Sequence, residues 1–209
     1  MEGVLQTIEA ALRWLGAVTG LGTLSLALLA MARSLRRPRG RVEGGARGIL
    51  RLPVLAPATI AFLAAGVWLW RPLPVRLSEW AQLVAAVLGG LLLVGGCALY
   101  LWGLRALGVM FGPSSGFGVA LHAGHRLIDA GPYAHVRHPM YLAVMLAAWG
   151  SLMLYRTWAT LAFAIMMLGL IVRARREERV LSDEFGEAWR EYAARVPRWF
   201  PLLRRRPPA

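Results

Sequence analysis

The sequence predicts an all-α membrane protein: a polytopic helical bundle with five transmembrane helices, the last of which extends into a cytoplasmic amphipathic helix. Three observations support this prediction. The 209 residues are 57% hydrophobic and only 17% charged, whereas a soluble domain carries about 25% charged residues. Five long stretches contain no charged side chain at all. The basic residues gather in alternate connections between those stretches.

Each charge-free stretch is expected to cross the bilayer as a helix. At 1.5 Å per residue the helices would be about 24 to 38 Å long, against a hydrocarbon core of roughly 30 Å. The first stretch follows Glu2 and Glu9 and precedes seven arginines, which is typical of a retained anchor and not of a cleaved signal peptide. The five stretches are residues 14–32, 52–70, 80–104, 139–155 and 157–172.

Small residues and a short turn indicate how these helices pack. Gly16 with Gly20, and Ala86 with Gly90, are spaced four apart, so the first and third helices have faces where a neighbouring backbone can approach closely. Only Arg156 separates the fourth stretch from the fifth. Those two helices are therefore expected to form a tight antiparallel hairpin.

The arginines predict the orientation of the bundle. All 24 basic residues are Arg, and all but four lie after the first span, after the third span or beyond the fifth. By the positive-inside rule, the N-terminus is expected outside and the C-terminus in the cytoplasm, in a plasma or inner membrane. The net charge of +13 then requires no nucleic acid as a partner. The four exceptions are Arg13, Arg71, Arg76 and Arg156.

Two segments on the expected cytoplasmic face do not fit a simple bundle. Residues 105–138 form a connection much longer than the roughly 2 to 8 residues that join bundle helices, and they hold every histidine of the chain. After the fifth span, Leu181, Phe185, Trp189 and Tyr192 recur at helical spacing on a charged background. This stripe predicts an amphipathic helix, and the lipid surface is one candidate partner for it.

The histidines and the single cysteine do not favour a metal centre. His122 and His125 are three residues apart, as are His135 and His138. A di-iron site needs roughly eight nitrogen or carboxylate ligands, and a single zinc would fit the spacing but has no further support. We therefore expect no metal. Cys97 falls inside the third span and is expected to be a small buried apolar residue.

The strongest motif is HRLIDAGPYAHVRHPMY, which covers residues 125–141. Pro139 at the first helical position leaves the free amides of that turn facing the preceding loop, which favours the binding of a carboxylate or another anion. A second motif, REERVLSDEFGEAWREYAARVPRWFP, follows after one helical hairpin.

The two motifs together resemble those of the integral-membrane methyltransferase family of isoprenylcysteine carboxyl methyltransferases and phospholipid N-methyltransferases. The family patterns are HxLVTxGPYxxxRHPxY and EExxLxxxFGxxYxxYxxxVPRxxP. This chain matches both in order and at compatible spacing. It departs from them at Asp129, where the family often has Thr, at Ala143, where it often has Gly, and at Trp189, where it often has Tyr.

The resemblance implies an enzyme that takes S-adenosylmethionine from the cytosol and a lipid or lipophilic methyl acceptor from the membrane. Methyl transfer from a sulfonium is an in-line displacement, so such a protein mainly aligns the reacting atoms and excludes water. The resemblance also implies one integral-membrane methyltransferase domain, 1–209. Within it, 1–104 would supply three spans, and 105–209 the cofactor-binding loop, the hairpin and the final helix.

The resemblance further implies which residues hold the donor. Gly131 would allow a close backbone approach, Tyr133 and Tyr141 would flank the adenine or the sulfonium, and His138 would donate to the carboxylate or the ribose. The full set of implied donor-binding residues is His125, Leu127, Gly131, Tyr133, His138, Tyr141 and Glu177.

The charged residues after the fifth span are expected to have different roles, some in donor binding and others in methyl transfer. Arg173 and Glu177 are four apart on one helical face, whereas Glu178 is turned by about 100°, so the two carboxylates have different roles. The resemblance gives Glu177 to the donor and makes Arg173 with Glu178 the catalytic pair that lines the transfer site. The alternatives are a simple interfacial salt bridge here and, for Arg137, a lipid-phosphate anchor.

Two other functions stay open on the sequence alone. Membrane sterol and steroid reductases, which use NADPH, end in a related RHxxY pattern, although the adjacent Glu177 and Glu178 favour the methyltransferase. A non-catalytic membrane protein with the same fold is the second alternative. The acceptor is also open among a prenylated cysteine carboxylate, a phosphoethanolamine headgroup, a small thiol and an isoprenoid-like lipid.

Overall fold

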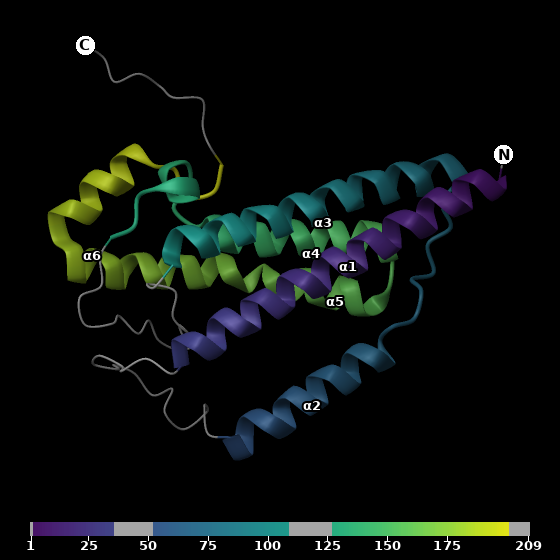
Figure 1. Ribbon diagram of the computed structural model, residues 1–209, viewed down its shortest axis with the longest axis horizontal. Coiled ribbons are helices and arrows are strands. Elements are labelled where there is room, and N and C mark those ends of the chain that lie inside the picture. The colour runs from purple at the N-terminus through teal and green to yellow at the C-terminus, as the bar shows by residue number, and fades with distance from the viewer. Residues whose placement is uncertain (1, 36–51, 109–126, 201–209) are drawn as a thin grey trace, which may run out of the picture.

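The computed structural model describes residues 2–35, 52–108 and 127–200, and every regular element within them is a helix (Figure 1). The all-α prediction is therefore confirmed for this part of the chain. In chain order the elements are α1 (Glu2–Leu35), α2 (Leu52–Trp68), α3 (Glu79–Leu107), the short 3₁₀ helix η3 (Gly131–Ala134), α4 (Pro139–Tyr155), α5 (Trp158–Met167) and α6 (Gly169–Arg195).

The antiparallel pair α3 and α4 forms the centre of the molecule. α1 packs along α3, α5 packs on α4, and α2 contacts α5 (Figure 1). A buried cluster of Ala86, Leu93, Cys97 and Leu154 lies where α3 meets α4. The prediction that Cys97 is a small buried residue is thus confirmed.

Glycine lets α3 and α4 approach backbone to backbone. A Cβ placed on Gly96 would lie 2.7 Å from the Ala143 carbonyl oxygen, and one placed on Gly89 would lie 2.7 Å from that of Gly150. Real Cβ atoms do not come so close to backbone atoms, so both positions require glycine. The helices therefore meet in closer contact than larger side chains would allow.

Only some of the small residues that the sequence places at helix contacts lie at such contacts in the structure. Ala86 is fully buried, and a Cβ on Gly16 would meet Leu93 and Leu154. A Cβ on Gly20 would have no neighbour within 4 Å among the described residues. The close contact between α3 and α4 is instead built on Gly89 and Gly96, which are seven residues apart on α3, and on Gly150 of α4.

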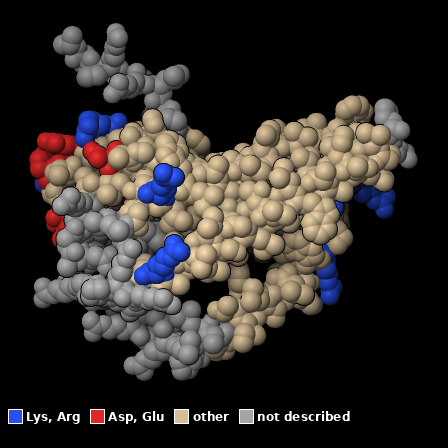
Figure 2. All heavy atoms as spheres, in the orientation of Figure 1, with Lys and Arg blue, Asp and Glu red and all other residues tan. Residues whose placement is uncertain are grey.

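The helices have the length and composition of a membrane protein. Among the described residues, three helices are long and apolar enough to cross a bilayer: Gly3–Ser34, Glu79–Leu107 and Trp158–Arg195, the last combining α5 with α6. Two shorter apolar helices cover Thr59–Trp68 and Pro139–Tyr155. Figure 2 shows that the centre of the visible face carries no acidic or basic side chain, while Asp and Glu gather at the α6 end.

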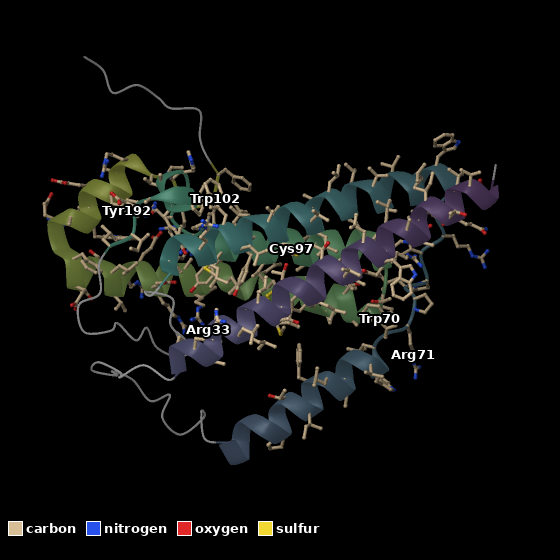
Figure 3. The ribbon with its side chains drawn as sticks, viewed as in Figure 1. Arg33, Trp70, Arg71, Cys97, Trp102 and Tyr192 are labelled. Atoms are coloured by element: carbon tan, nitrogen blue, oxygen red, sulfur yellow. The ribbon has the colours of Figure 1, made fainter. Side chains whose placement is uncertain are left out.

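The predicted hairpin between α4 and α5 is present, and it lies at the end of the bundle where the N-terminus begins. Arg13 and Arg156 both pair with Glu9 of α1, and Arg71 lies over the Trp68 ring. Figure 3 shows Trp70 and Arg71 at this end, and Arg33, Trp102 and Tyr192 at the other. Arg13, Arg71 and Arg156 therefore lie at one end of the bundle, and Arg33 lies at the other.

The last helix, α6, is bent, and its apolar pattern does not predict this bend. At Gly186 the backbone takes φ 52° and ψ −116°, and the rest of α6 folds back toward η3 (Figure 1). Such a positive φ is accessible mainly to glycine. The fold buries Trp189 and Tyr192, which are 6% and 3% exposed, with Leu181 and Phe185 packed against them. This part of the apolar stripe packs within the protein, so it is not a lipid-facing surface.

Candidate functional site

The loop before α4 is fixed at the end of the bundle by backbone contacts. Gly131 has φ 62°, and a Cβ there would lie 3.2 Å from the Ala106 side chain of α3. The Tyr192 hydroxyl donates to the Tyr133 carbonyl at 2.8 Å, which ties the folded-back part of α6 to η3. Leu127 packs against the same buried cluster as Tyr192. Gly131 is therefore needed both for its conformation and for its approach to α3.

A first polar network joins α4 to α6. The Tyr141 hydroxyl donates to Glu177 Oε2 at 2.6 Å, and the Arg173 Nε donates to the same hydroxyl at 2.8 Å. The Arg173 guanidinium also lies 5.8 Å from the centre of the Tyr141 ring. This network brings together three of the residues expected at the site, and one aromatic hydroxyl links the other two.

A second network surrounds the carboxylate of Glu178, which is 9% exposed. The Arg137 Nη1 and the His138 Nε2 lie 3.0 and 3.1 Å from Glu178 Oε1. The Arg198 Nε lies 2.9 and 3.1 Å from the two carboxylate oxygens, and its Nη2 also contacts Oε2. Glu178 therefore anchors three basic side chains from two separate segments.

Ring stacking connects the two networks. The His138 and Tyr141 rings are parallel, with an interplanar angle of 1° and centroids 5.4 Å apart. The centroid of the His138 ring also lies 5.6 Å from that of the Trp199 ring. The start of α4 and its N-cap thus present Tyr141 to Glu177 and His138 to Glu178, so the two adjacent carboxylates have different partners.

Burial and charge set the protonation of this end, which lies beyond the apolar part of the last helix. Burial alone would raise the pKa of Glu178, but hydrogen bonds from His138 and Arg198, together with the charge of Arg137, lower it to about 2. Burial lowers the pKa of Arg137 against the opposing effect of Glu178. For the tyrosines, burial has the opposite effect. It raises the pKa of Tyr192 to about 12 and also raises the pKa of Tyr133. Glu178 is consequently an anion at any physiological pH.

Arg137 is inside the protein and not a lipid anchor. Its side chain is largely buried beside Glu178, and its Nε is buried without a hydrogen-bond partner in the described segments. A buried guanidinium nitrogen without a partner carries a cost that a bound acceptor would remove. The free donor lies next to the first turn of α4, whose amides the sequence predicts to favour an anion.

The structure places most of the expected site residues together. His138, Tyr141, Arg173, Glu177 and Glu178 form the two joined networks, and Gly131 and Tyr133 lie in the adjoining η3 turn. His125 lies outside the described residues. The hydrogen bond of Arg173 reaches Tyr141 and so the Glu177 side, while Glu178 is held by other cations.

Sequence reasoning gave no role to two residues that contact this site. Arg198 and Trp199 touch Glu178 and His138, and both lie in the VPRWFP end of the second motif. The available signal was a lone arginine and a tryptophan inside an otherwise apolar segment. Within the described residues no group of three or more His, Cys, Asp or Glu side chains has the arrangement of a metal site. His122 and His125 lie outside that part of the chain.

Comparison with known proteins identifies the family. The sequence profile described as "Phospholipid methyltransferase" matches residues 84–188, which is half of the chain. The chain belongs to this family. Residues 84–188 include α4, α5 and the part of α6 that carries Arg173, Glu177 and Glu178.

Three curated relatives add detail. A methanethiol S-methyltransferase of Pseudomonas deceptionensis is 31% identical over 167 residues, covering 74% of this chain and 60% of the relative. A protein-S-isoprenylcysteine O-methyltransferase of Schizosaccharomyces pombe is 35% identical over 81 residues, 38% of this chain and 34% of the relative. The cobalt-zinc-cadmium resistance protein CzcN of Cupriavidus metallidurans is 38% identical over 82 residues, 37% and 36% of the two chains. The chain thus spans between about a third and three fifths of the length of these relatives.

Proposed function

We propose that this member of the phospholipid methyltransferase family is an integral-membrane enzyme that transfers a methyl group from S-adenosylmethionine to a lipid or lipophilic acceptor. One observation carries the proposal: the two sequence motifs converge, with Tyr141 of the first bonded to Glu177 of the second. We further propose that residues 1–209 act as a single methyltransferase domain. The names of the relatives and the family support methyl transfer and give no support to the reductase alternative.

The described residues fit an amino-acid-derived sulfonium donor. The buried Arg137 Nε has no partner in this part of the chain, and it lies beside the first turn of α4, so a carboxylate is a group to which it would donate. Glu177 and the faces of the Tyr133 and Tyr141 rings are suited to a cation. Together with Leu127, Gly131 and His138, and with His125 outside the described residues, they form the proposed donor site.

S-adenosylmethionine would supply an electrophilic methyl group. The residues of this chain would then align the acceptor and exclude water, since an in-line displacement needs little proton transfer. Arg173, oriented by Tyr141, is proposed to hold an anionic acceptor atom or an adjoining carboxylate. Glu178 is proposed to complete the transfer site as the fixed anion opposite Arg137 and Arg198.

The location follows from the donor and the charges. We propose that the α6 end of the bundle faces the cytoplasm, where S-adenosylmethionine is made, and that the N-terminus lies outside. The uneven distribution of arginines supports this orientation. The five-span count is proposed on the same basis, with α2 and α4 crossing beside the three longer helices. The acceptor would enter from the membrane between helices.

The acceptors named for the relatives share a chemical property that narrows the choice of acceptor for this chain. The relatives are named for methyl transfer to the sulfur of methanethiol and to an oxygen of isoprenylcysteine. Both a thiolate and a carboxylate are anions, and Arg173 is suited to either. We therefore propose an acceptor whose reacting atom is anionic and whose remaining part is apolar.

A ligand-dependent melting experiment tests the proposed function. A ligand that binds only the native state raises the melting temperature. S-adenosylmethionine and S-adenosylhomocysteine are expected to stabilise the purified protein in detergent, and NADPH is expected to have no effect. Transfer of a labelled methyl group to methanethiol, to a prenylated cysteine and to membrane lipid extract would then identify the acceptor. Stabilisation by NADPH alone would contradict the proposal.

A further inference from the structure

Residues 196–199, which follow α6, lie directly on the site. The Arg137 backbone amide donates to the Pro197 carbonyl at 2.9 Å. Next along the chain, Arg198 bonds both oxygens of Glu178, and the Trp199 ring lies 5.6 Å from that of His138. Three successive residues of this segment therefore contact the Arg137–His138 pair or the carboxylate that holds it. The proposed reaction uses Arg198 only as a counterion of Glu178 and assigns no role to Pro197 or Trp199.

The ion pair of Arg198 differs from an ordinary surface pair. Its partner Glu178 is buried, and the contacts of Nε with two oxygens are charge-assisted. The neighbouring pair Glu187–Arg190 on α6 has side chains that are 70% and 69% exposed, so solvent screens it and it contributes little. The stronger ion pair therefore belongs to the segment whose Trp199 ring lies against His138.

We propose that Arg198 is a positioning residue for donor binding: by pairing with Glu178 it holds Trp199 against His138, and so keeps His138 stacked on Tyr141. This inference rests on the proposed function, because the stack is part of the proposed donor site. The chain of contacts runs from Arg198 through Glu178 and Trp199 to His138. Arg198 itself need not touch the donor.

Loss of Arg198 is expected to leave the protein folded. The Arg198 side chain is 35% exposed, so its removal opens no cavity in the bundle core. Glu178 would keep Arg137 and His138 as partners, so its buried charge would remain compensated. The effect should therefore appear in donor binding and not in the assembly of α1 to α5.

The experiment compares Arg198→Gln, Arg198→Lys and the matched control Arg190→Gln in the full chain. Donor affinity is measured by calorimetric titration with S-adenosylmethionine, and KM for the donor and kcat are measured separately. Arg198→Gln is expected to weaken donor binding on the order of tenfold, the effect of losing a charge-assisted contact. The change should appear mainly in KM, Arg198→Lys should restore part of the affinity, and Arg190→Gln should stay within about twofold of wild type.

A double-mutant cycle shows whether Arg198 acts through Glu178. In a Glu178→Gln background, Arg198→Gln is expected to cause little further loss of donor affinity, because the pair is already broken. Additive losses, or wild-type affinity in Arg198→Gln, would overturn the inference while leaving the proposed function intact. Failure of the wild-type protein to bind the donor at all would overturn the proposed function, and the inference with it.

Discussion

The Tyr141 hydroxyl donates to Glu177 Oε2 at 2.6 Å, although the two residues lie on different helices and 36 positions apart in the sequence. The Nε of Arg173 donates to the same hydroxyl. A single phenol oxygen therefore fixes the relative positions of a cation and an anion on one face of α6. In the proposed enzyme these two charges serve opposite partners, the acceptor and the donor.

Substitutions at Glu177 and Arg173 should separate donor binding from transfer. Glu177→Gln replaces a charge-assisted contact by a neutral one and is expected to weaken donor affinity. Arg173→Ala is expected to keep donor affinity nearly intact while turnover falls on the order of a hundredfold, because a nucleophile misplaced by about 1 Å reacts poorly. Calorimetric donor titration and methyl-transfer assays measure the two effects.

Tyr141→Phe serves as the control for this pair. It removes the shared hydroxyl and keeps the ring that stacks on His138, so both donor affinity and turnover should fall by intermediate amounts. If Arg173→Ala loses donor binding as severely as Glu177→Gln, Arg173 is a partner of that carboxylate and the proposed division of roles is wrong.

The orientation of the chain can be tested with single cysteines in a Cys97→Ala background. Cys97 is buried, and the substitution removes little volume, so the background protein should fold. Cysteines at Arg41 and Arg204 should be protected from an impermeant thiol reagent in intact cells, whereas one at Arg76 should be labelled. Labelling at Arg41 and Arg204 with protection at Arg76 would contradict this orientation. It would place the candidate site outside the cytoplasm, where S-adenosylmethionine is not made.

The glycine contact between α3 and α4 should be sensitive to a single methyl group. Gly96→Ala would place a Cβ 2.7 Å from the Ala143 carbonyl oxygen, and backbone atoms cannot yield cheaply, so a loss of about 1 to 3 kcal/mol is expected. The adjacent Gly95→Ala has no neighbour within 4 Å in the described structure and gains helix propensity. Thermal unfolding in detergent should show Gly96→Ala melting well below Gly95→Ala, and equal melting temperatures would refute the close contact.

The lowered pKa of Glu178 predicts how stability depends on pH. A carboxyl group with a folded-state pKa of about 2, against a usual value of 4.5, stabilises the protein above pH 4.5 and loses that effect as pH falls toward 2. Wild type should therefore melt at a higher temperature than Glu178→Gln at pH 7. The difference should shrink between pH 4.5 and pH 3. A difference that stays constant over this range would mean that the carboxylate is not held by its basic neighbours.

The cores of the helices could be predicted from the sequence, but their ends and bends could not. Absence of charge located the α3 and α4 spans to within a few residues, because a bilayer excludes charged groups over a fixed thickness. α1 starts at Glu2, well before the predicted 14, because a helix continues into water where hydropathy carries no signal. The kink at Gly186 could not be predicted from the spacing of the apolar residues, because a change in one φ angle leaves that spacing unchanged.

For the site, the motifs predicted which residues meet but not how they pair. The turn of about 100° between Glu177 and Glu178 follows from helix geometry, and the structure gives each carboxylate different partners as expected. Arg198 lies beyond the bend at Gly186, and the spacing of residues in the motif does not show that this bend returns the chain to Glu178. Arg198 was therefore visible in the motif without a role, and Arg137 was open to interpretation as a lipid anchor.

The glycine contact of α3 with α4 has a consequence for motion. Where backbones touch through Gly89 and Gly96, there are no side-chain rotamers to freeze or to exchange, so this contact costs no side-chain entropy and offers no alternative packing. The pair should act as a rigid frame on every timescale shorter than unfolding. We therefore expect that the proposed donor enters and leaves the α6 end by displacement of the η3 turn and the folded-back end of α6, while the α3–α4 pair stays fixed.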